Sequence, residues 1–279
     1  MITIRRMTLA DIPFGLRLKT EANWNQVEGD WQRFLAMEPE GCFVAEWEGE
    51  PVGTLAVCVL GPVAWIGMVL VSGTMRGKGL GTALMRQALD FTDGRGIPTT
   101  RLDATPMGQP IYEKLGFVHE YELVRFDGVL PPGQPSPDVL RYAPTDLEEI
   151  ITLDRLVSGA DRRKLLEHLL RERGDEARVV REDGRLTGFS LSRLGAQALF
   201  IGPCLATTER AGTSLLTDAF GRHAGERVYV DIPLANGPAA ALATAAGLTV
   251  QRHLLRMYRG VRVEDRPLQL WASSGPEKG

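Results

Sequence analysis

Glycine and cationic residues alternate between residues 76 and 82, where the chain reads Arg-Gly-Lys-Gly-Leu-Gly-Thr. An apolar run over 65–71 precedes this stretch and predicts a buried strand, and apolar residues at helical spacing over 80–89 predict a helix after it. Free amide groups and the dipole at a helix N-terminus attract anions, and glycine lets a phosphate approach the backbone. Arg76 and Lys78 add positive charge. The stretch therefore predicts a pyrophosphate site.

The spacing excludes two common phosphate-binding loops. A Walker loop needs four residues between its first glycine and Gly-Lys, whereas three separate Gly73 from Gly77 and Gly79 follows Lys78. A dinucleotide fingerprint needs a third glycine where this chain has Thr82. Taken alone, the loop could still be an ordinary strand-to-helix turn.

Two motifs together resemble a known family. Residues 76–81 fit the pattern Arg/Gln-x-x-Gly-x-Gly/Ala, with Val69-Leu70-Val71 leading into it, and so resemble the acetyl-CoA loop of the GNAT superfamily of N-acetyltransferases. The family also carries Asn-x-x-Ala-x-x-x-Tyr followed by Gly-Phe. In this chain Tyr112 and Gly116-Phe117 match that signature, while Thr105 replaces the asparagine and Gly108 the alanine.

The resemblance implies an α/β fold in which a mixed, mostly antiparallel sheet is flanked by helices. Two of its strands splay apart in a V, and the pantetheine arm of acetyl-CoA fills the gap like a strand. One N–H of the segment matching 69–71 would face the thioester oxygen. The implied cofactor-binding set is Val69, Leu70, Val71, Arg76, Gly77, Lys78, Gly79, Leu80, Gly81, Thr82, Thr105 and Gly108.

Tyr112 matches the position where the family commonly places a general acid that protonates the CoA sulfur. A phenol with a pKa of about 10 is protonated at neutral pH and can donate to a thiolate. The alternative is a tyrosine that merely packs on the cofactor. Unchanged turnover after Tyr112→Phe would remove it from the catalytic residues.

The general base is open. Many relatives use a carboxylate early on the central strand, near Trp65 here, but residues 63–71 contain no acidic residue. The remaining candidates, acting directly or through a water chain, are Glu21, Glu28 and Asp30 in the helical region expected beside the acceptor; the favoured interpretation of each is a solvated surface residue. Residues Trp24, Asn25 and Trp31 either line the acceptor pocket or belong to a core stripe.

The remaining pattern predicts a mixed α/β order before residue 130. We expect strands at 2–6, 99–104 and 117–126, a hairpin of 41–46 with 51–60, and helices starting near 8–11, over 20–37 and over 110–115. The stretch 128–137 is too rich in proline for a regular element.

After that linker the chain repeats itself. Gly188 matches Gly53, Ile201-Gly202 matches Ile66-Gly67 and Gly212 matches Gly77, all at an offset of 135 residues. We therefore predict a catalytic domain at 1–130, a linker at 131–137, a degenerate copy at 138–262 and a frayed tail at 263–279. The copy is expected to be inactive because Ser214 and Leu216 replace loop glycines, Glu209 would repel phosphate and Ala243 replaces the tyrosine.

Composition restricts the remaining possibilities. A net charge of −3 gives no reason to expect nucleic acid, and no apolar run reaches the length of a membrane span. Three cysteines without paired spacing and four scattered histidines predict neither disulfides nor a metal, and favour a cytoplasmic location.

The sequence thus predicts an acetyl-CoA-dependent N-acetyltransferase, monomeric or homodimeric, acting on a small-molecule or peptide amine. The alternatives are a non-catalytic acyl-CoA-binding or regulatory protein and an enzyme that uses a longer acyl-CoA.

Overall fold

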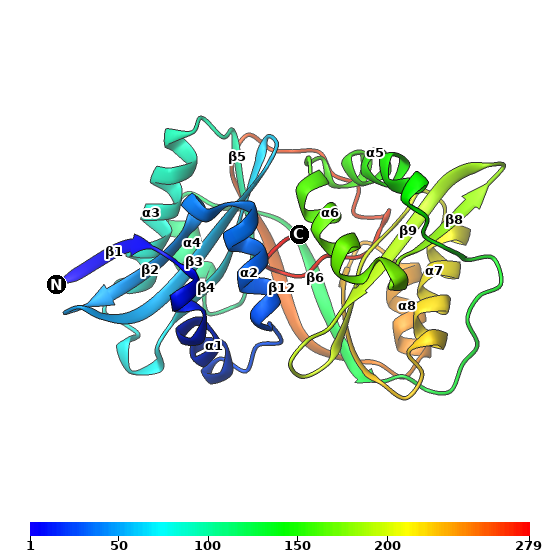
Figure 1. Cartoon of the computed structure of the whole chain (residues 1–279), viewed down its shortest axis with the longest axis horizontal. Helices are drawn as coiled ribbons and strands as arrows, with labels where there is room; N and C mark the ends of the chain where they lie inside the picture. The colour runs from blue at the N-terminus through cyan, green and yellow to red at the C-terminus, as the bar shows by residue number, and fades with distance from the viewer.

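The computed structural model describes all residues, 1–279, as two similar halves side by side (Figure 1). The first half contains β1 (Ile2–Arg6), α1 (Ile12–Glu21), α2 (Glu28–Met37), β2 (Cys42–Trp47), β3 (Glu50–Leu60), β4 (Val63–Val71), α3 (Leu80–Gly94), β5 (Thr99–Ala104), α4 (Gln109–Lys114) and β6 (Val118–Val129).

The second half repeats this order after the proline-rich linker. It contains β7 (Leu140–Arg141), α5 (Leu147–Ser158), α6 (Arg163–Arg173), β8 (Arg178–Glu182), β9 (Arg185–Arg193), β10 (Leu199–Ala206), α7 (Glu209–Arg222), β11 (Arg227–Pro233), α8 (Gly237–Ala245), β12 (Thr249–Gly260) and β13 (Leu270–Ala272).

All strands belong to one thirteen-stranded sheet in which the halves exchange their last long strands. The order is β1-β2-β3-β4-β5-β12-β6-β11-β10-β9-β8-β7, with β13 beside β10. Strand β12 thus pairs with β5 of the first half, and β6 pairs with β11 of the second; the two strands run side by side at the centre of Figure 1. Neither half has a complete sheet without a strand from the other.

In each half, two parallel strands joined by a crossover helix separate after a few residues. Strand β4 pairs with β5 only as far as Trp65 opposite Arg101, and β10 pairs with β11 only as far as Ile201 opposite Val230. The expected mixed sheet, with a V-shaped splay between two strands in each half, is confirmed.

The predicted hairpin, central strand and loop-helix unit are also confirmed, but the second helix is shorter than expected. It starts at Glu28 rather than at residue 20, because Asn23 adopts a left-handed backbone (φ 55°) just after α1. The Asp30 carboxylate then accepts a hydrogen bond from the Val27 amide at 2.9 Å and fixes the start of α2.

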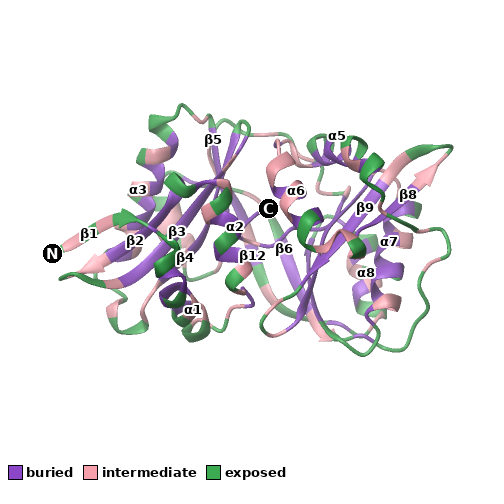
Figure 2. Cartoon of the chain, in the orientation of Figure 1, coloured by how far each residue is buried: buried purple, intermediate pink, exposed green.

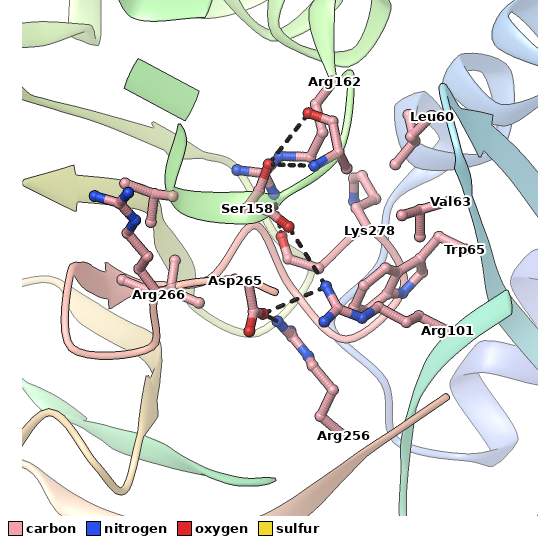
Figure 3. Close-up of a pocket in the computed structure, with 14 residues that line it drawn as sticks. Leu60, Val63, Trp65, Arg101, Ser158, Arg162, Arg256, Asp265, Arg266 and Lys278 are labelled. Carbon is pink, nitrogen blue, oxygen red and sulfur yellow. Dashed lines mark hydrogen bonds and ion pairs between the residues drawn. The ribbon is translucent and has the colours of Figure 1, made fainter. Parts of the chain in front are cut away.

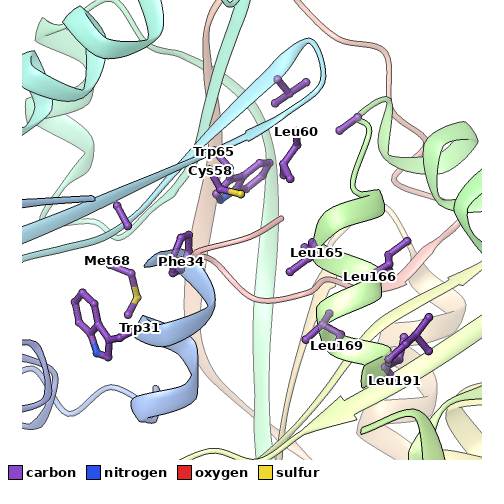
Figure 4. Packing of buried hydrophobic residues seen from close by; sticks show 14 of the residues in the cluster. Trp31, Phe34, Cys58, Leu60, Trp65, Met68, Leu165, Leu166, Leu169 and Leu191 are labelled. Atoms are coloured by element: carbon purple, nitrogen blue, oxygen red, sulfur yellow. The ribbon is translucent and has the colours of Figure 1, made fainter. Parts of the chain in front are cut away.

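Burial is greatest in the inner strands of each half, β3 and β4 in the first and β10 and β11 in the second (Figure 2). The largest apolar cluster, of 30 buried residues, continues from the first half into the second. Figure 4 shows Trp31 and Phe34 of α2 on one side and Leu165 and Leu169 of α6 on the other. A core shared in this way joins the halves into one body.

The final residues are not a frayed tail; that expectation is wrong. Strand β13 pairs with β10, and Ser273, Ser274, Glu277 and Lys278 are buried, so the chain ends between the halves (Figure 1). No helix is both long and apolar enough to cross a membrane.

Candidate active site between the two halves

The glycine loop lies between β4 and the start of α3, as predicted. Gly77 and Gly79 have left-handed backbones (φ 77° and 81°), and a Cβ atom added to either would meet no other heavy atom within 4 Å. Leu80 is buried in the core, so only its backbone can face a ligand. The Lys78 ammonium lies 5.2 Å from the centroid of the Trp47 ring. The loop is therefore an open cradle of amides beside the positive charge of Lys78.

A bulge bends β4 where it leaves β5. The register with β3 slips between Thr54 opposite Leu70 and Ala56 opposite Gly67, so two residues of β4 face one of β3. Met68 at this bulge has a φ of 56°, which is uncommon for a residue with a side chain. Bulges of this kind end pairing and redirect backbone groups. The backbone over 67–69 is thus distorted at the apex of the splay.

The splay of the first half opens into a cavity of about 80 Å³ that communicates with solvent. It brings together Val69, Thr105 and Tyr112 from the sequence-predicted set; Arg76–Thr82, Leu70, Val71 and Gly108 do not line it. The full lining is Trp24, Gln26, Ile66, Gly67, Met68, Val69, Leu102, Asp103, Thr105, Tyr112, Arg125, Arg252, Leu254, Pro276 and Glu277.

The Tyr112 phenol lies against the cavity without a hydrogen-bond partner in the protein. Burial raises the pKa of Tyr112 to about 12, so the hydroxyl stays protonated well above neutral pH. A Cβ added to Gly108 would lie 3.0 Å from the Tyr112 Oη and 2.8 Å from its ring. Glycine in place of the family's alanine thus makes room for this ring.

Two buried Arg–Asp pairs, made by arginines of the exchanged strands, meet the cavity through Asp103 and Arg125. Arg256 of β12 binds Asp103 of β5 at 2.9 and 3.0 Å, and Arg125 of β6 binds Asp231 of β11 at 2.7 and 2.8 Å. Each pair is bidentate and joins one half to the other.

The segment after β13 forms part of the cavity wall through Pro276 and Glu277. The Trp65 indole N–H donates to the Pro276 carbonyl at 3.0 Å, and the Gln26 amide donates to Glu277 Oε2 at 3.0 Å. A Cβ on Gly67 would lie 2.7 Å from the Glu277 Cβ, so only glycine lets the segment pass there.

The corresponding gap in the second half is filled by the chain itself. Beyond the point where β10 and β11 diverge, β13 pairs with β10, and Cys204 lies opposite Ala272. On the other side the Ser273 amide donates to the Asp231 carbonyl of β11 at 2.8 Å. Trp271 lies on Gly212, where an added Cβ would be 1.8 Å from the indole. Strand β13 therefore occupies the position that is open in the first half.

The second half also lacks an amide at its own bulge. The register of β10 with β9 slips between Ile201 and Cys204, as the register of β4 with β3 does. Pro203 of β10 stands at the position that matches Met68. Proline has no N–H to donate. The missing amide adds to the differences noted from the sequence.

A second, smaller cavity lies beneath the first and is closed by ion pairs. Figure 3 shows Asp265 between Arg101 and Arg256, at 3.3 and 3.9 Å. The Arg101 guanidinium also donates to the Val263 carbonyl at 2.9 Å. Since these charges are satisfied within the protein, this cavity is a structural junction between the halves.

None of the three proposed bases lines the cavity. Glu21 accepts a weak bond from the Gly73 amide at 3.4 Å, and Glu28 is bonded to Gln32. Asp30 is not a solvated surface residue: it is completely buried, and Arg193, Lys278 and Arg33 hold its pKa well below the usual range despite the opposing effect of burial. Of the aromatic candidates, Trp24 lines the cavity and Trp31 belongs to the core. Asn25 instead bonds the backbone of residues 197 and 198.

Sequence reasoning missed the lining residues supplied by β6, β12 and the final segment. One signal was available, because the Arg–Asp pairs are duplicated. Asp103 and Asp231 occupy equivalent strands, and Arg125 and Arg256 are 131 residues apart, the offset that also relates Gly116 to Gly247. The pairing across halves is invisible in the sequence because it depends on the strand exchange.

Two family comparisons agree with this geometry. Residues 11–117 match the acetyltransferase (GNAT) family, and residues 150–272 match an acetyltransferase (GNAT) domain. This chain is a tandem GNAT acyltransferase. Both the family expected from the two motifs and the duplication of its fold are thereby confirmed.

Relatives of this tandem acyltransferase share its length. It is 26% identical to holothin acyltransferase of Pseudoalteromonas sp. (strain SANK 73390) over 92% of this chain and 87% of that one. It is 25% identical to the uncharacterized N-acetyltransferase YitH of Bacillus subtilis (strain 168), over 78% and 77%.

Solved structures show the same architecture. A putative acetyltransferase from Pyrococcus horikoshii superposes with a TM-score of 0.85 at 26% identity, covering 100% of this chain and 96% of that one. A tandem GNAT protein from the clavulanic acid biosynthesis pathway gives 0.66 at 15% identity, covering 95% and 100%, and so supports the fold alone.

Proposed function

We propose that this GNAT protein is an acetyl-CoA-dependent N-acetyltransferase with one working site, in the first half, acting on a small amine. The observation that carries the proposal is the difference between the two gaps. The gap between β4 and β5 is open and lined by Tyr112, and β4 continues into an open glycine loop, whereas β13 fills the gap between β10 and β11.

The chain's residues have separable tasks in this proposal. Amides over 76–82, with the charges of Arg76 and Lys78, hold the pyrophosphate, and residues 69–71 with Thr105 and Gly108 flank the pantetheine arm. Acetyl-CoA supplies the acyl thioester. Transfer forms a C–N bond, breaks the C–S bond and leaves a sulfur that needs a proton. Tyr112 holds a proton at Oη beside the cavity, and burial keeps it there at neutral pH.

The acceptor enters between the halves. Trp24 and Gln26 come from the first half, and Arg252 and Leu254 come from β12. No unpaired carboxylate lines it, so the acceptor loses its proton to solvent or to water in the cavity. The domain at 138–262 serves as the inactive partner that completes the site.

The test is thiol release from acetyl-CoA by the full chain over a panel of primary amines, with calorimetry to count bound acetyl-CoA. We expect release with at least one amine and one acetyl-CoA per chain. Binding without release on every amine would favour the non-catalytic acyl-CoA-binding alternative, and absence of binding would refute the proposal. Replacing acetyl-CoA with longer acyl-CoA thioesters measures the acyl preference.

A further inference from the structure

One cation in the candidate cavity has no counter-ion. Arg252 of β12 lines the cavity, is partly buried, and donates only from Nε to Gln251 Oε1 at 3.2 Å. It makes no ion pair, although it lies close to the Arg125–Asp231 pair. Burial and the neighbouring Arg125 lower the pKa of the Arg252 guanidinium, which indicates an electrostatically unfavourable position for this charge.

The other charged groups around the cavity are already satisfied. Arg125 is bidentate to Asp231, and Arg256 is bidentate to Asp103. Glu277 accepts from Arg193 at 2.8 Å and is also bound by Lys278. After these pairs are formed, the cavity retains one uncompensated positive charge, at Arg252.

Arg252 faces the side of the sheet from which an acceptor would approach. Side chains alternate along β12, and Leu255 and Met257 pack with the α3 core on one face. Arg256, on the other face, stacks 4.7 Å over Trp65 and binds Asp103. Arg252 and Leu254 share that face and reach the same cavity as Trp24 and Gln26.

We propose that the acceptor is an amine that also carries a carboxylate, and that Arg252 binds this carboxylate while the amine points toward the apex of the β4–β5 splay. This inference rests on the proposed function. A guanidinium presents a planar set of donors that matches a carboxylate, and a partly desolvated, unpaired one gains most from such a partner.

The experiment compares amino acids with the amines that remain when their carboxylate is removed: tyrosine with tyramine, histidine with histamine, and tryptophan with tryptamine. Thiol release from acetyl-CoA is measured for the full chain, for Arg252→Gln and Arg252→Lys, and for Arg185→Gln as a control at an exposed turn of the second half. For at least one pair we expect kcat/KM to favour the carboxylated member by roughly 10- to 100-fold, the range of a charge-assisted hydrogen bond.

Arg252→Gln should abolish that preference mainly through KM, Arg252→Lys should keep part of it, and Arg185→Gln should keep all of it. If the decarboxylated member is preferred in every pair, or if Arg252→Gln leaves the preference unchanged, the inference is overturned while the proposed function stands.

A binding measurement decides the matter even without turnover. The N-acetylated forms of all three pairs are titrated into the CoA-loaded chain, and for at least one pair only the carboxylated form should bind, with affinity lost in Arg252→Gln. Equal affinity for both members of every pair, or binding of none of the six compounds, would overturn the inference. If they bind as expected but no amine releases thiol, the proposed function fails and the carboxylate site survives.

Discussion

Replacing Trp271 by alanine should destabilise the protein strongly although this residue lies in the last eleven of the chain. Its side chain is 2% exposed and rests on Gly212 in the gap between β10 and β11. Removing a buried tryptophan costs about 3–5 kcal/mol, because lost burial and the resulting cavity both contribute. The full value is expected here because the backbone of β13 stays held by β10 and β11 and cannot collapse into the space.

The measurement is urea unfolding of the full chain, followed by far-UV circular dichroism. Leu268→Ala is the matched control, since Leu268 lies on the same segment but is 66% exposed; it should change the free energy of unfolding by less than about 0.5 kcal/mol. Calorimetry with acetyl-CoA should still give one site per chain in Trp271→Ala, because Ser214 and Leu216 replace the loop glycines of the second half.

A loss of less than about 1 kcal/mol in Trp271→Ala would refute the argument that β13 is an integral strand of the second half. If Trp271→Ala binds two molecules of acetyl-CoA per chain in calorimetry, the expectation that the loop of the second half cannot bind phosphate is refuted.

Other predictions follow from the first half and its supports. Tyr112→Phe should lower kcat by roughly 10²-fold or more while the Kd for acetyl-CoA changes little. Tyr142→Phe in the second half is the control and should change neither quantity. If Tyr112→Phe changes kcat and Kd by equal factors, Tyr112 only packs on the cofactor. With a pKa of about 12 for Tyr112, the pH–rate profile should show no descending limb up to pH 10, and one near pH 9 would contradict its role as proton donor. Gly81→Asp should raise the Kd for acetyl-CoA at least about tenfold without lowering the melting temperature, since an acidic residue suits a helix N-terminus but repels pyrophosphate. The pKa values of Asp30 and Glu277 lie below their ordinary values of 3.8 and 4.5. Their charged forms therefore stabilise the fold above those ordinary values, and this stabilisation is lost as the pH falls through the lowered pKa values. Urea unfolding at pH 7, 5 and 3 should show a lower free energy of unfolding only between pH 5 and pH 3.

The sequence by itself determined the elements that local pattern governs. The apolar run before residue 71, the glycines at 77 and 79 and the helical stripe after residue 80 specify a strand, an open loop and a helix through hydrophobic periodicity and backbone freedom. The offset of 135 residues likewise revealed the duplication, because equivalent positions in two copies keep similar residues for similar packing.

Only the tertiary structure decided which residues meet. The residue pattern of β6 does not predict whether this strand pairs with β5 or with β11, since both pairings satisfy the same alternation of side chains. The exchange carries Arg252 into the first half's cavity, and the path of the last residues places β13 in one gap and Glu277 beside the other. These are contacts between segments far apart in the sequence, which arise from burial of a shared core rather than from any sequence pattern.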